Sequence, residues 1–437
     1  MNTSSNNLSG VYDDEVAGKG RILRAAKPFA QGQVIFREKC HVCASWDLEI
    51  CTACETDHEI TAESDCSKVH KLLGKHIVKD LPEIVDFLVG LEVVGDVDRA
   101  RMVLKCIAMH REDPEMFRQI ESLSHVNLPK CIEAMQLLNN KYQDIIPSDL
   151  SIERLGAALA VFNTNCHELR RFHGSGLFLT ASRIEHSCVP TCNFTTFGKE
   201  LWITALINIE TGDALSIDYR NFFYKPKEER QSTLKKSYEF QCTCVGCLHL
   251  PDRTRAFVCH SKKCQGVVCP YPNGEWKCLS CKNTLSSIDR DVCLKAAELA
   301  ENFAFESLAD IDSIINQHVL HPTHHLLFWG LEHLGCEAAA SPTLSANAVI
   351  EIWERIVVIA TTVVLTPHKK KVLYFDILGQ VKATQGDFEG TKSAYRRAYE
   401  ESRLVSGEHS ETTTELQKFY ENPPRSRDEV IARYADR

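Results

Sequence analysis

The stretch from Ser182 to Cys192, SRIEHSCVPTC, constrains the fold most when it is taken with two motifs further along the chain. Gly212 to Tyr219 reads GDALSIDY, and the motif Cys242-x-Cys244-x2-Cys247 follows it. Cys188 and the three cysteines of the last motif supply the four thiolates that a structural zinc needs. A zinc bound there would tie the loop around Cys188 to the segment that follows Tyr219. We therefore expect one cleft, lined by that loop and by Tyr219, Tyr238 and Phe240.

The order of these motifs resembles the SET lysine methyltransferases, and specifically the SET-and-MYND family. The shared order is HSC-x-P, then G-D-x-L-S-I-x-Y, then Y-x-F-x-C-x-C-x2-C. The resemblance implies a fold of small sheets with a knotted loop, S-adenosyl-L-methionine as cofactor, and a protein lysine side chain as methyl acceptor. It predicts an α+β multidomain protein with a split SET domain, a helical insertion, zinc-binding modules and a C-terminal TPR-like helical domain.

Length and composition bound the class of protein. The chain has 437 residues, which is too long for one compact core, so we expect two or three domains. Its net charge of -9 argues against bulk binding of nucleic acid, and the basic run from Lys225 to Lys236 is interpreted as a solvated face. The longest apolar run, Ile356 to Leu365, is too short to span a bilayer and predicts a buried helix.

Twenty cysteines without an apolar secretory signal indicate a reducing compartment, where C-x2-C pairs favour zinc over disulfides. We therefore expect the protein to be located in the cytoplasm and the nucleus. We also expect it to be a monomer and not to associate with membranes. The predicted division is a disordered tail (1–10), the first part of the SET domain (11–39), a degenerate MYND-like zinc insertion (40–70), a helical insertion (71–150), the core SET domain (151–224), a post-SET zinc segment with a four-cysteine ribbon (225–283) and the TPR-like domain (284–437).

Two further cysteine groups predict zinc. Cys259-x4-Cys264 and Cys278-x2-Cys281 have the spacing of a ribbon, which we interpret as shaping a domain junction. The other group begins as Cys40-x2-Cys43-x7-Cys51-x2-Cys54, where the family carries its two-zinc finger. The ligands that usually complete this finger are missing, so the insertion could hold one zinc or two. It could serve as a metal-stapled loop without a binding role or as a module that binds a partner. The expected total is two to four zinc ions, and the more natural set here is Cys51, Cys54, Cys66 and His70.

Local patterns predict the smaller elements. Ile22-Leu23 and Val34 to Phe36 are expected to form two strands joined by a turn at Gln31-Gly32. Gly174 to Gly176 is expected to be a turn, and strands are expected over Leu201 to Leu206 and Ala214 to Tyr219. Near the C-terminus, a helix–turn–helix pair is expected around Gly386-Asp387, with Ala394 and Ala398 at the helix contact.

The resemblance also implies roles for individual residues. Tyr219 matches the catalytic tyrosine. A channel of tyrosines suits methyl transfer, since hydroxyl groups orient the amine and ring faces tolerate a cation. The implied cofactor-binding residues are Gly18, Lys19, Gly20, Asn165, Ser182, Ile184, Glu185, His186, Tyr219, Tyr238 and Phe240.

One departure from the family pattern bears on activity. Glu185 stands where the family nearly always has an asparagine, and an ionised carboxylate can only accept hydrogen bonds. It could pair with a positive charge of the cofactor or repel the cofactor's carboxylate. The leading hypothesis is a protein-lysine methyltransferase. The alternative is a catalytically weak or inactive scaffold or transcriptional co-regulator that binds partners through its zinc modules and its helical C-terminal domain, with the MYND-like and TPR-like regions as the candidate partner-binding parts. A zinc-dependent nucleic-acid binder is a third, disfavoured class.

Overall fold

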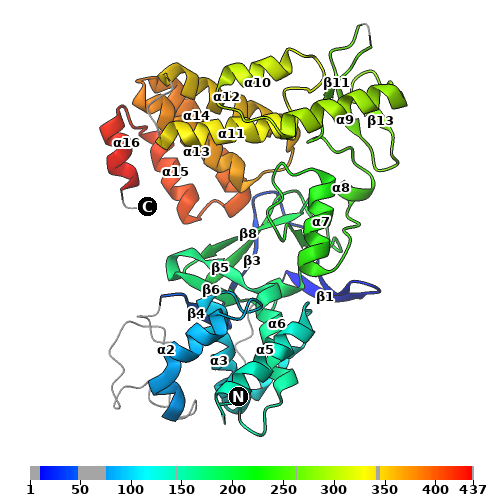
Figure 1. Cartoon of the computed structure of the whole chain (residues 1–437). Coiled ribbons are helices and arrows are strands. Elements are labelled where there is room, and N and C mark those ends of the chain that lie inside the picture. The colour runs from blue at the N-terminus through cyan, green and yellow to red at the C-terminus, as the bar shows by residue number, and fades with distance from the viewer. Residues whose placement is uncertain (1–9, 48–74, 144, 262, 341–344, 436–437) are drawn as a thin grey trace.

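The computed structural model describes residues 10–47, 75–143, 145–261, 263–340 and 345–435. Figure 1 shows two lobes. One lobe holds the small sheets and the first helices, and the other is almost wholly helical and ends at the C-terminus. Each lobe has its own main cluster of buried apolar side chains, which explains why the chain divides there.

The N-terminal hairpin was only partly predicted. Strands β1 (Val11–Val16) and β2 (Gly20–Ala25) pair antiparallel. Gly18 and Gly20 have φ of +78° and +77°, the left-handed conformation that glycine adopts without strain. The expected pairing of Ile22-Leu23 with Val34 to Phe36 is wrong, because β3 (Val34–Lys39) pairs with β9 (Glu200–Ala205) instead.

The strand predicted over 201–206 is confirmed. It is β9, the centre of a three-stranded sheet in the order β3-β9-β8, with β8 at Cys192–Phe197. Gly198 makes the β8–β9 turn with φ of +53°. Leu201 and Ile203 are fully buried, so this sheet carries part of the first lobe's core.

The prediction of a turn at Gly174 to Gly176 is wrong. These residues form β6 (Gly174–Leu177), the central strand between β4 (Val42–Ser45) and β5 (His167–Leu169). A Cβ on Gly174 would lie 2.1 Å from the carbonyl oxygen of Ala44. Glycine is therefore needed because the neighbouring backbone approaches so closely, and not for a turn.

The helical insertion is confirmed. It consists of α2 (Lys75–Val89), α3 (Val97–Glu112), α4 (Pro114–Glu121) and α5 (Leu128–Lys141), followed by α6 (Ile152–Asn165). Asp113-Pro114 separates α3 from α4, and the side chain of Asp113 accepts a hydrogen bond from the backbone N–H of Met116. Pro129 lies in the first turn of α5, where a proline is tolerated.

Two short elements position the candidate site. Strands β7 (Glu185–His186) and β10 (Ser216–Ile217) pair in parallel, so that Glu185 lies opposite Ser216 and His186 opposite Ile217. The backbone N–H of Ser187 adds a hydrogen bond to the carbonyl of Ile217 at 3.0 Å. The segment after β10, which carries Tyr219, therefore leaves the sheet beside the loop that follows β7.

The remainder of the chain follows the first lobe and forms the helical lobe. Helices α7 (Lys227–Tyr238) and α8 (Val245–Leu248) lead to a three-stranded ribbon, β11 (Phe257–Val258), β12 (Val267–Pro270) and β13 (Trp276–Cys278). The helical lobe then contains α9 (Ser287–Glu301), α10 (Leu308–Ile315), α11 (His325–Ala340), α12 (Ala346–Val363), α13 (Lys369–Thr384), α14 (Phe388–Ser406), α15 (Glu411–Glu421) and α16 (Arg427–Tyr434). Among the described residues, no helix is long and apolar enough to cross a membrane.

Helices α13 and α14 form the expected helix–turn–helix pair. Gly386 has φ of +74° in the turn, and Ala394 and Ala398 are buried. A Cβ on Gly379 would lie 2.9 Å from the ring of Tyr395, so the small residue lets the two helices approach closely.

The end of α14 docks on the sheet of the first lobe. The side-chain amide of Asn193 donates to the carbonyl of Val405 at 3.1 Å, and the hydroxyl of Thr195 lies 3.3 Å from that of Ser406. The two lobes are thus joined by direct polar contacts as well as by the connecting chain.

Candidate functional site

Four cysteine sulfurs come together beside strand β7. The sulfurs of Cys188, Cys242, Cys244 and Cys247 all lie within 4.8 Å of one another. Cys188 Sγ is 3.9 Å from that of Cys242 and 3.6 Å from that of Cys247. A tetrahedral zinc with Zn–S bonds of about 2.3 Å would hold its sulfurs about 3.8 Å apart, so these residues fit a structural zinc.

His186 connects this cluster to the aromatic residues. Its Nε2 lies 3.4 Å from Cys188 Sγ, and the backbone N–H of Tyr219 donates to its Nδ1 at 3.3 Å. Burial lowers the pKa of His186 to about 4, so the ring is neutral. Because Nδ1 accepts, the ring proton is assigned to Nε2, where it points to the sulfur.

An aromatic cluster surrounds His186. The ring of Tyr219 lies 5.2 Å from the imidazole and 5.1 Å from the ring of Tyr238, and Phe222 and Phe240 each lie 5.9 Å from the imidazole. The hydroxyl of Tyr219 donates to the carbonyl of Ile184 at 2.7 Å. Burial raises the pKa of Tyr219 and that of Tyr238, so both hydroxyl groups keep their protons near neutral pH.

The glycine-rich hairpin reaches the same place. Lys19, in the β1–β2 turn between Gly18 and Gly20, has its Nζ 2.5 Å from a carboxylate oxygen of Glu185. The Lys19 side chain is 48% exposed and that of Glu185 only 19%. The structure therefore brings together two regions that were predicted separately to bind the cofactor, and it gives the unusual Glu185 a cationic partner.

The comparison with known proteins agrees with this geometry. The family model described as the SET domain matches residues 20–220. This chain is 24% identical to the N-lysine methyltransferase SMYD2 of Rattus norvegicus over 270 residues, covering 53% of this chain and 58% of that protein. Residues 20–220 therefore match the SET domain, and the chain is similar to proteins of the SET-and-MYND type.

Two other relatives match shorter parts of the chain. The protein-lysine N-trimethyltransferase SMYD5 of Homo sapiens is 30% identical over 193 residues, covering 39% of this chain and 44% of that protein. The histone-lysine N-methyltransferase SMYD3 of Homo sapiens is 34% identical over 84 residues, covering 19% of each. The chain thus spans less than two thirds of the length of these relatives.

Two other predicted site residues of the SET domain are held by backbone carbonyls. Ser182 Oγ donates to the carbonyl of Phe178 at 2.6 Å. Asn165 lies at the end of α6, and its side-chain amide donates to the carbonyls of Ser124 and Val161 at 2.8 and 3.0 Å. Their predicted contact with the cofactor stays a prediction.

The MYND-like prediction can be placed only in part. Cys40 directly follows β3, and Cys43 lies in β4 opposite Gly176. The ligand set Cys51, Cys54, Cys66 and His70 lies outside the described residues.

The sequence analysis missed Asp218, which shapes the turn after β10. The Asp218 carboxylate accepts from the backbone N–H groups of Phe222 at 2.5 Å and Arg220 at 3.1 Å. These bonds hold the turn that carries Tyr219 and Phe222, while burial raises the pKa of Asp218 to about 6. No signal in the sequence distinguished this aspartate from a surface carboxylate.

Arg230 was also missed, because it lies in the basic run that was interpreted as a solvated face. Its ε-nitrogen is buried, and its guanidinium donates to the carbonyl of Lys225. Burial lowers the pKa of Arg230, but Asp252 and the thiols of Cys188 and Cys247 more than offset this and raise it. A cation at this place offsets the negative charge of a four-thiolate zinc site.

The second cysteine cluster lies in the ribbon. The sulfurs of Cys259 and Cys281 are 3.7 Å apart, as are those of Cys264 and Cys278, and all four lie within 4.8 Å of one another. These residues also fit zinc. Cys259 and Cys278 belong to the buried cluster of the helical lobe, so this site braces the junction between the ribbon and the helices.

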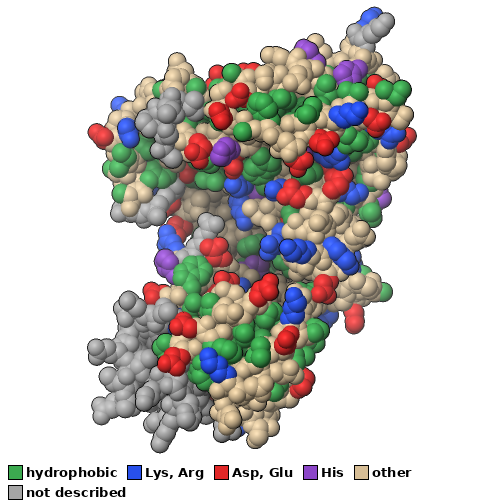
Figure 2. All heavy atoms as spheres, viewed as in Figure 1, with side chains coloured by type: hydrophobic (Ala, Val, Ile, Leu, Met, Phe, Trp, Pro, Cys, Tyr) green, Lys and Arg blue, Asp and Glu red, His purple; other side chains and the backbone are tan. Residues whose placement is uncertain are grey.

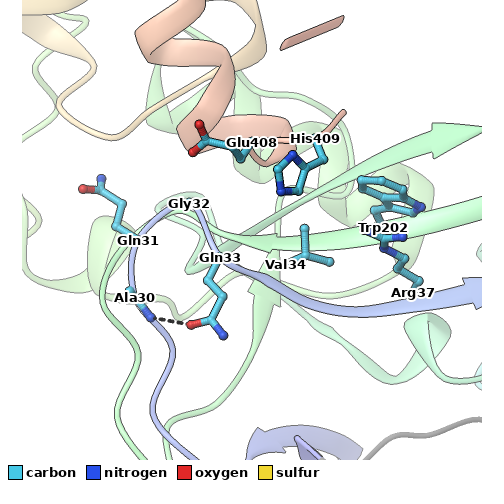
Figure 3. A pocket seen from close by; sticks show the side chains of 9 residues that line it. All are labelled: Ala30, Gln31, Gly32, Gln33, Val34, Arg37, Trp202, Glu408 and His409. Carbon is cyan, nitrogen blue, oxygen red and sulfur yellow. Dashed lines mark hydrogen bonds between the residues drawn. The ribbon is translucent and has the colours of Figure 1, made fainter. Parts of the chain in front are cut away.

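The surface is hollowed between the two lobes, where Figure 2 shows lysine and arginine side chains gathering. A separate pocket of about 440 Å³ lies at the joint between the SET sheet and the segment after α14 (Figure 3). Its walls include Gln31, Arg37, Trp202 and His409, and none of the aromatic cluster residues lines it. We therefore place the chemistry at the aromatic cluster and not at this pocket.

Proposed function

We propose that the chain is an S-adenosyl-L-methionine-dependent protein-lysine N-methyltransferase. The observation that carries the proposal is the junction of Tyr219, Tyr238 and Phe240 with the loop at His186 and with the Lys19 hairpin. The segments come from four different parts of the chain, and a half-buried set of aromatic groups beside a partly exposed charged pair is a site with two distinct halves.

The charged half suits a zwitterionic cofactor. S-adenosyl-L-methionine, when bound, supplies a methyl group on a positively charged sulfur. Lys19 offers a cation for a carboxylate, and Glu185 offers an anion for an ammonium or sulfonium group. Since Lys19 already offsets the charge of Glu185, the carboxylate does not present an unbalanced negative charge to the cofactor, and this weakens the argument for an inactive scaffold.

The aromatic half suits the lysine. The Tyr219 hydroxyl uses its proton to bond the Ile184 carbonyl, so its oxygen is left to accept from the lysine amine and to orient the nitrogen lone pair. The amine must be neutral to act as a nucleophile, and removal from water lowers its pKa. With the cofactor bound, the lone pair of the amine would form the new N–CH₃ bond while the S–CH₃ bond broke and the sulfur kept the electron pair. The ring faces then stabilise the cation, which loses a proton to water.

The test is transfer of labelled methyl groups to protein lysines. The zinc-loaded chain is incubated with methyl-labelled S-adenosyl-L-methionine and with core histones or arrayed non-histone proteins. Tyr219→Phe removes the orienting oxygen while keeping the ring, and we expect a loss of transfer on the order of 100-fold with little change in cofactor affinity. Cofactor binding without any transfer across these substrates would favour the scaffold.

We further propose that the α13–α14 pair is part of a TPR-like domain and that the protein acts as a monomer in the cytoplasm and nucleus. Support comes from the helix pair itself and from the eight cysteines of the two clusters, which suit zinc in a reducing compartment. The same proposal includes partner binding through the MYND-like insertion and the TPR-like domain. Light scattering would test the monomeric state, and cell fractionation would test the location.

A further inference from the structure

A pocket of about 500 Å³ lies in the helical lobe, between the α9–α10 loop and helix α11. Figure 1 shows α9 beside α11. The lining combines three aromatic rings with two carboxylates, from Phe303, Phe305, Trp329, Glu301 and Glu306. Aromatic faces and carboxylates are the two kinds of group that attract an organic cation in proteins.

The aromatic walls are fixed in place. A Cβ on Gly330 would lie 2.8 Å from the ring of Phe305, so the glycine lets this ring lie against α11. The rings of Phe303 and Phe305 are 5.4 Å apart and tilted by 54°. Ser307 and Asp310 form a capping box at the start of α10, which holds the loop that presents these rings.

The charges of the pocket favour a cation. Glu301 and Glu306 are exposed, and within the described part of the chain neither forms an ion pair. The indole of Trp329 already has a cation near it, because Lys225 Nζ lies 5.1 Å from its ring centre. That ammonium is offset by Glu229, whose carboxylate is 2.7 Å away, and His333 is the other titratable group of the lining.

We propose that this pocket binds the side chain of a lysine or methylated lysine presented by a protein segment. The aliphatic part of that side chain would lie against Phe303, which is 42% exposed, and the ammonium would lie near Glu301 and Glu306. None of these residues belongs to the aromatic cluster of the SET domain, so the pocket would hold a second lysine away from the reaction site. The proposal does not depend on methyl transfer.

The test uses ligand-observed NMR on the full zinc-loaded chain. The probes are Nα-acetyl-lysine methylamide, its Nε-trimethyl form, and a neutral analogue with a tert-butyl group in place of the trimethylammonium. We expect millimolar binding of both cations and at least fivefold weaker binding of the neutral analogue. Binding to the SET site adds the same background to every variant, so differences between variants report on the pocket alone.

Glu301→Gln combined with Glu306→Gln should weaken both cationic probes at least fivefold, and Phe303→Leu should weaken the trimethylated probe most. Glu298→Gln is the matched control, since it removes a carboxylate from an exposed position of α9 outside the lining. Equal binding of the neutral analogue, or an equal effect of the control, would overturn the proposal. Gly330→Ala, which displaces Phe305, gives an independent check in a chain whose carboxylates are intact.

Discussion

The ammonium of Lys19 lies 2.5 Å from the carboxylate of Glu185, although the two residues are 166 positions apart in the chain. One belongs to the glycine turn of the first hairpin, and the other begins the short strand that leads to Cys188. A second pair, Arg183 with Asp13 at 2.8 Å, joins the same two regions. The hairpin is therefore held against the loop by charge, at the place where we expect the cofactor.

The first prediction concerns this pair. Lys19→Gln should weaken binding of S-adenosyl-L-methionine on the order of fivefold to tenfold, because Glu185 then faces the cofactor without its cation. Adding Glu185→Asn to that variant should recover part of the affinity. Calorimetric titration measures both, with Glu15→Gln on the same hairpin as the control. Strictly additive effects of the two substitutions would show that the pair does not act as a unit.

The second prediction separates the two cysteine clusters. Cys242→Ser and Cys259→Ser should each remove one equivalent of zinc, measured by metal analysis. Cys242→Ser should also abolish cofactor binding, since Tyr238 and Phe240 lie on the segment that this zinc holds. Cys259→Ser should keep cofactor binding and lower the melting temperature by several degrees.

Cys269→Ser is the matched control for these variants. Cys269 lies in β12 of the same ribbon and is fully buried, but its sulfur is not one of the four that cluster. It should keep the full zinc content. Loss of cofactor binding in Cys259→Ser would mean that the ribbon supports the SET site as well as the helical lobe.

The third prediction tests the joint between the lobes. Gly407 has φ of +89°, and a Cβ there would lie 2.9 Å from Val34 Cγ2. Gly386 has φ of +74° with open space around it. Gly386→Ala should therefore lower the free energy of unfolding by about 1 kcal/mol from backbone strain alone, and Gly407→Ala by about 2 to 3 kcal/mol. Denaturant unfolding compares the two variants. Equal losses of unfolding free energy would show that close packing around Gly407 contributes nothing beyond backbone strain.

Much of the candidate site could be predicted because its signals are local. The spacing of Cys242, Cys244 and Cys247 is fixed by the geometry of zinc, and the GDALSIDY motif places Tyr219 just after a short strand, although that strand covers only Ser216–Ile217 of the predicted 214–219. The helical insertion likewise follows from its apolar period. These features can be predicted without knowing which residues lie next to them in the folded chain.

The features that the sequence analysis did not predict depend on neighbours that are distant in the sequence. Gly174 is required by the backbone of Ala44, and the half-buried Arg230 lies near cysteines of other segments, Cys188 and Cys247. The acidic strand β1, VYDDEV, has weak strand propensity and forms because β2 pairs with it. The partner of Glu185 could not be foreseen for the same reason, since only the folded chain brings Lys19 to it.

The last prediction concerns acid sensitivity. The imidazole of His167 lies 4.5 Å from the ring of Phe194 and 5.9 Å from that of Phe178, and burial lowers its pKa to about 4. The unfolded chain binds a proton at this histidine below its ordinary pKa of about 6.5, whereas the folded chain does so only near 4. Stability from this group is therefore present above pH 6.5 and is lost as the pH falls from 6.5 toward 4.

His167→Phe keeps an aromatic ring at this position and removes the titration. The variant should lose less stability than the natural chain between pH 6.5 and 4.5, by up to about 2 kcal/mol. Melting curves across this range, with zinc in excess, measure the difference, and acid effects on the zinc sites cancel because both chains share them. His409→Gln, at an exposed histidine, is the control and should follow the natural chain. Parallel pH profiles for His167→Phe and the natural chain would show that His167 accepts its proton without opening the core between β5 and β8.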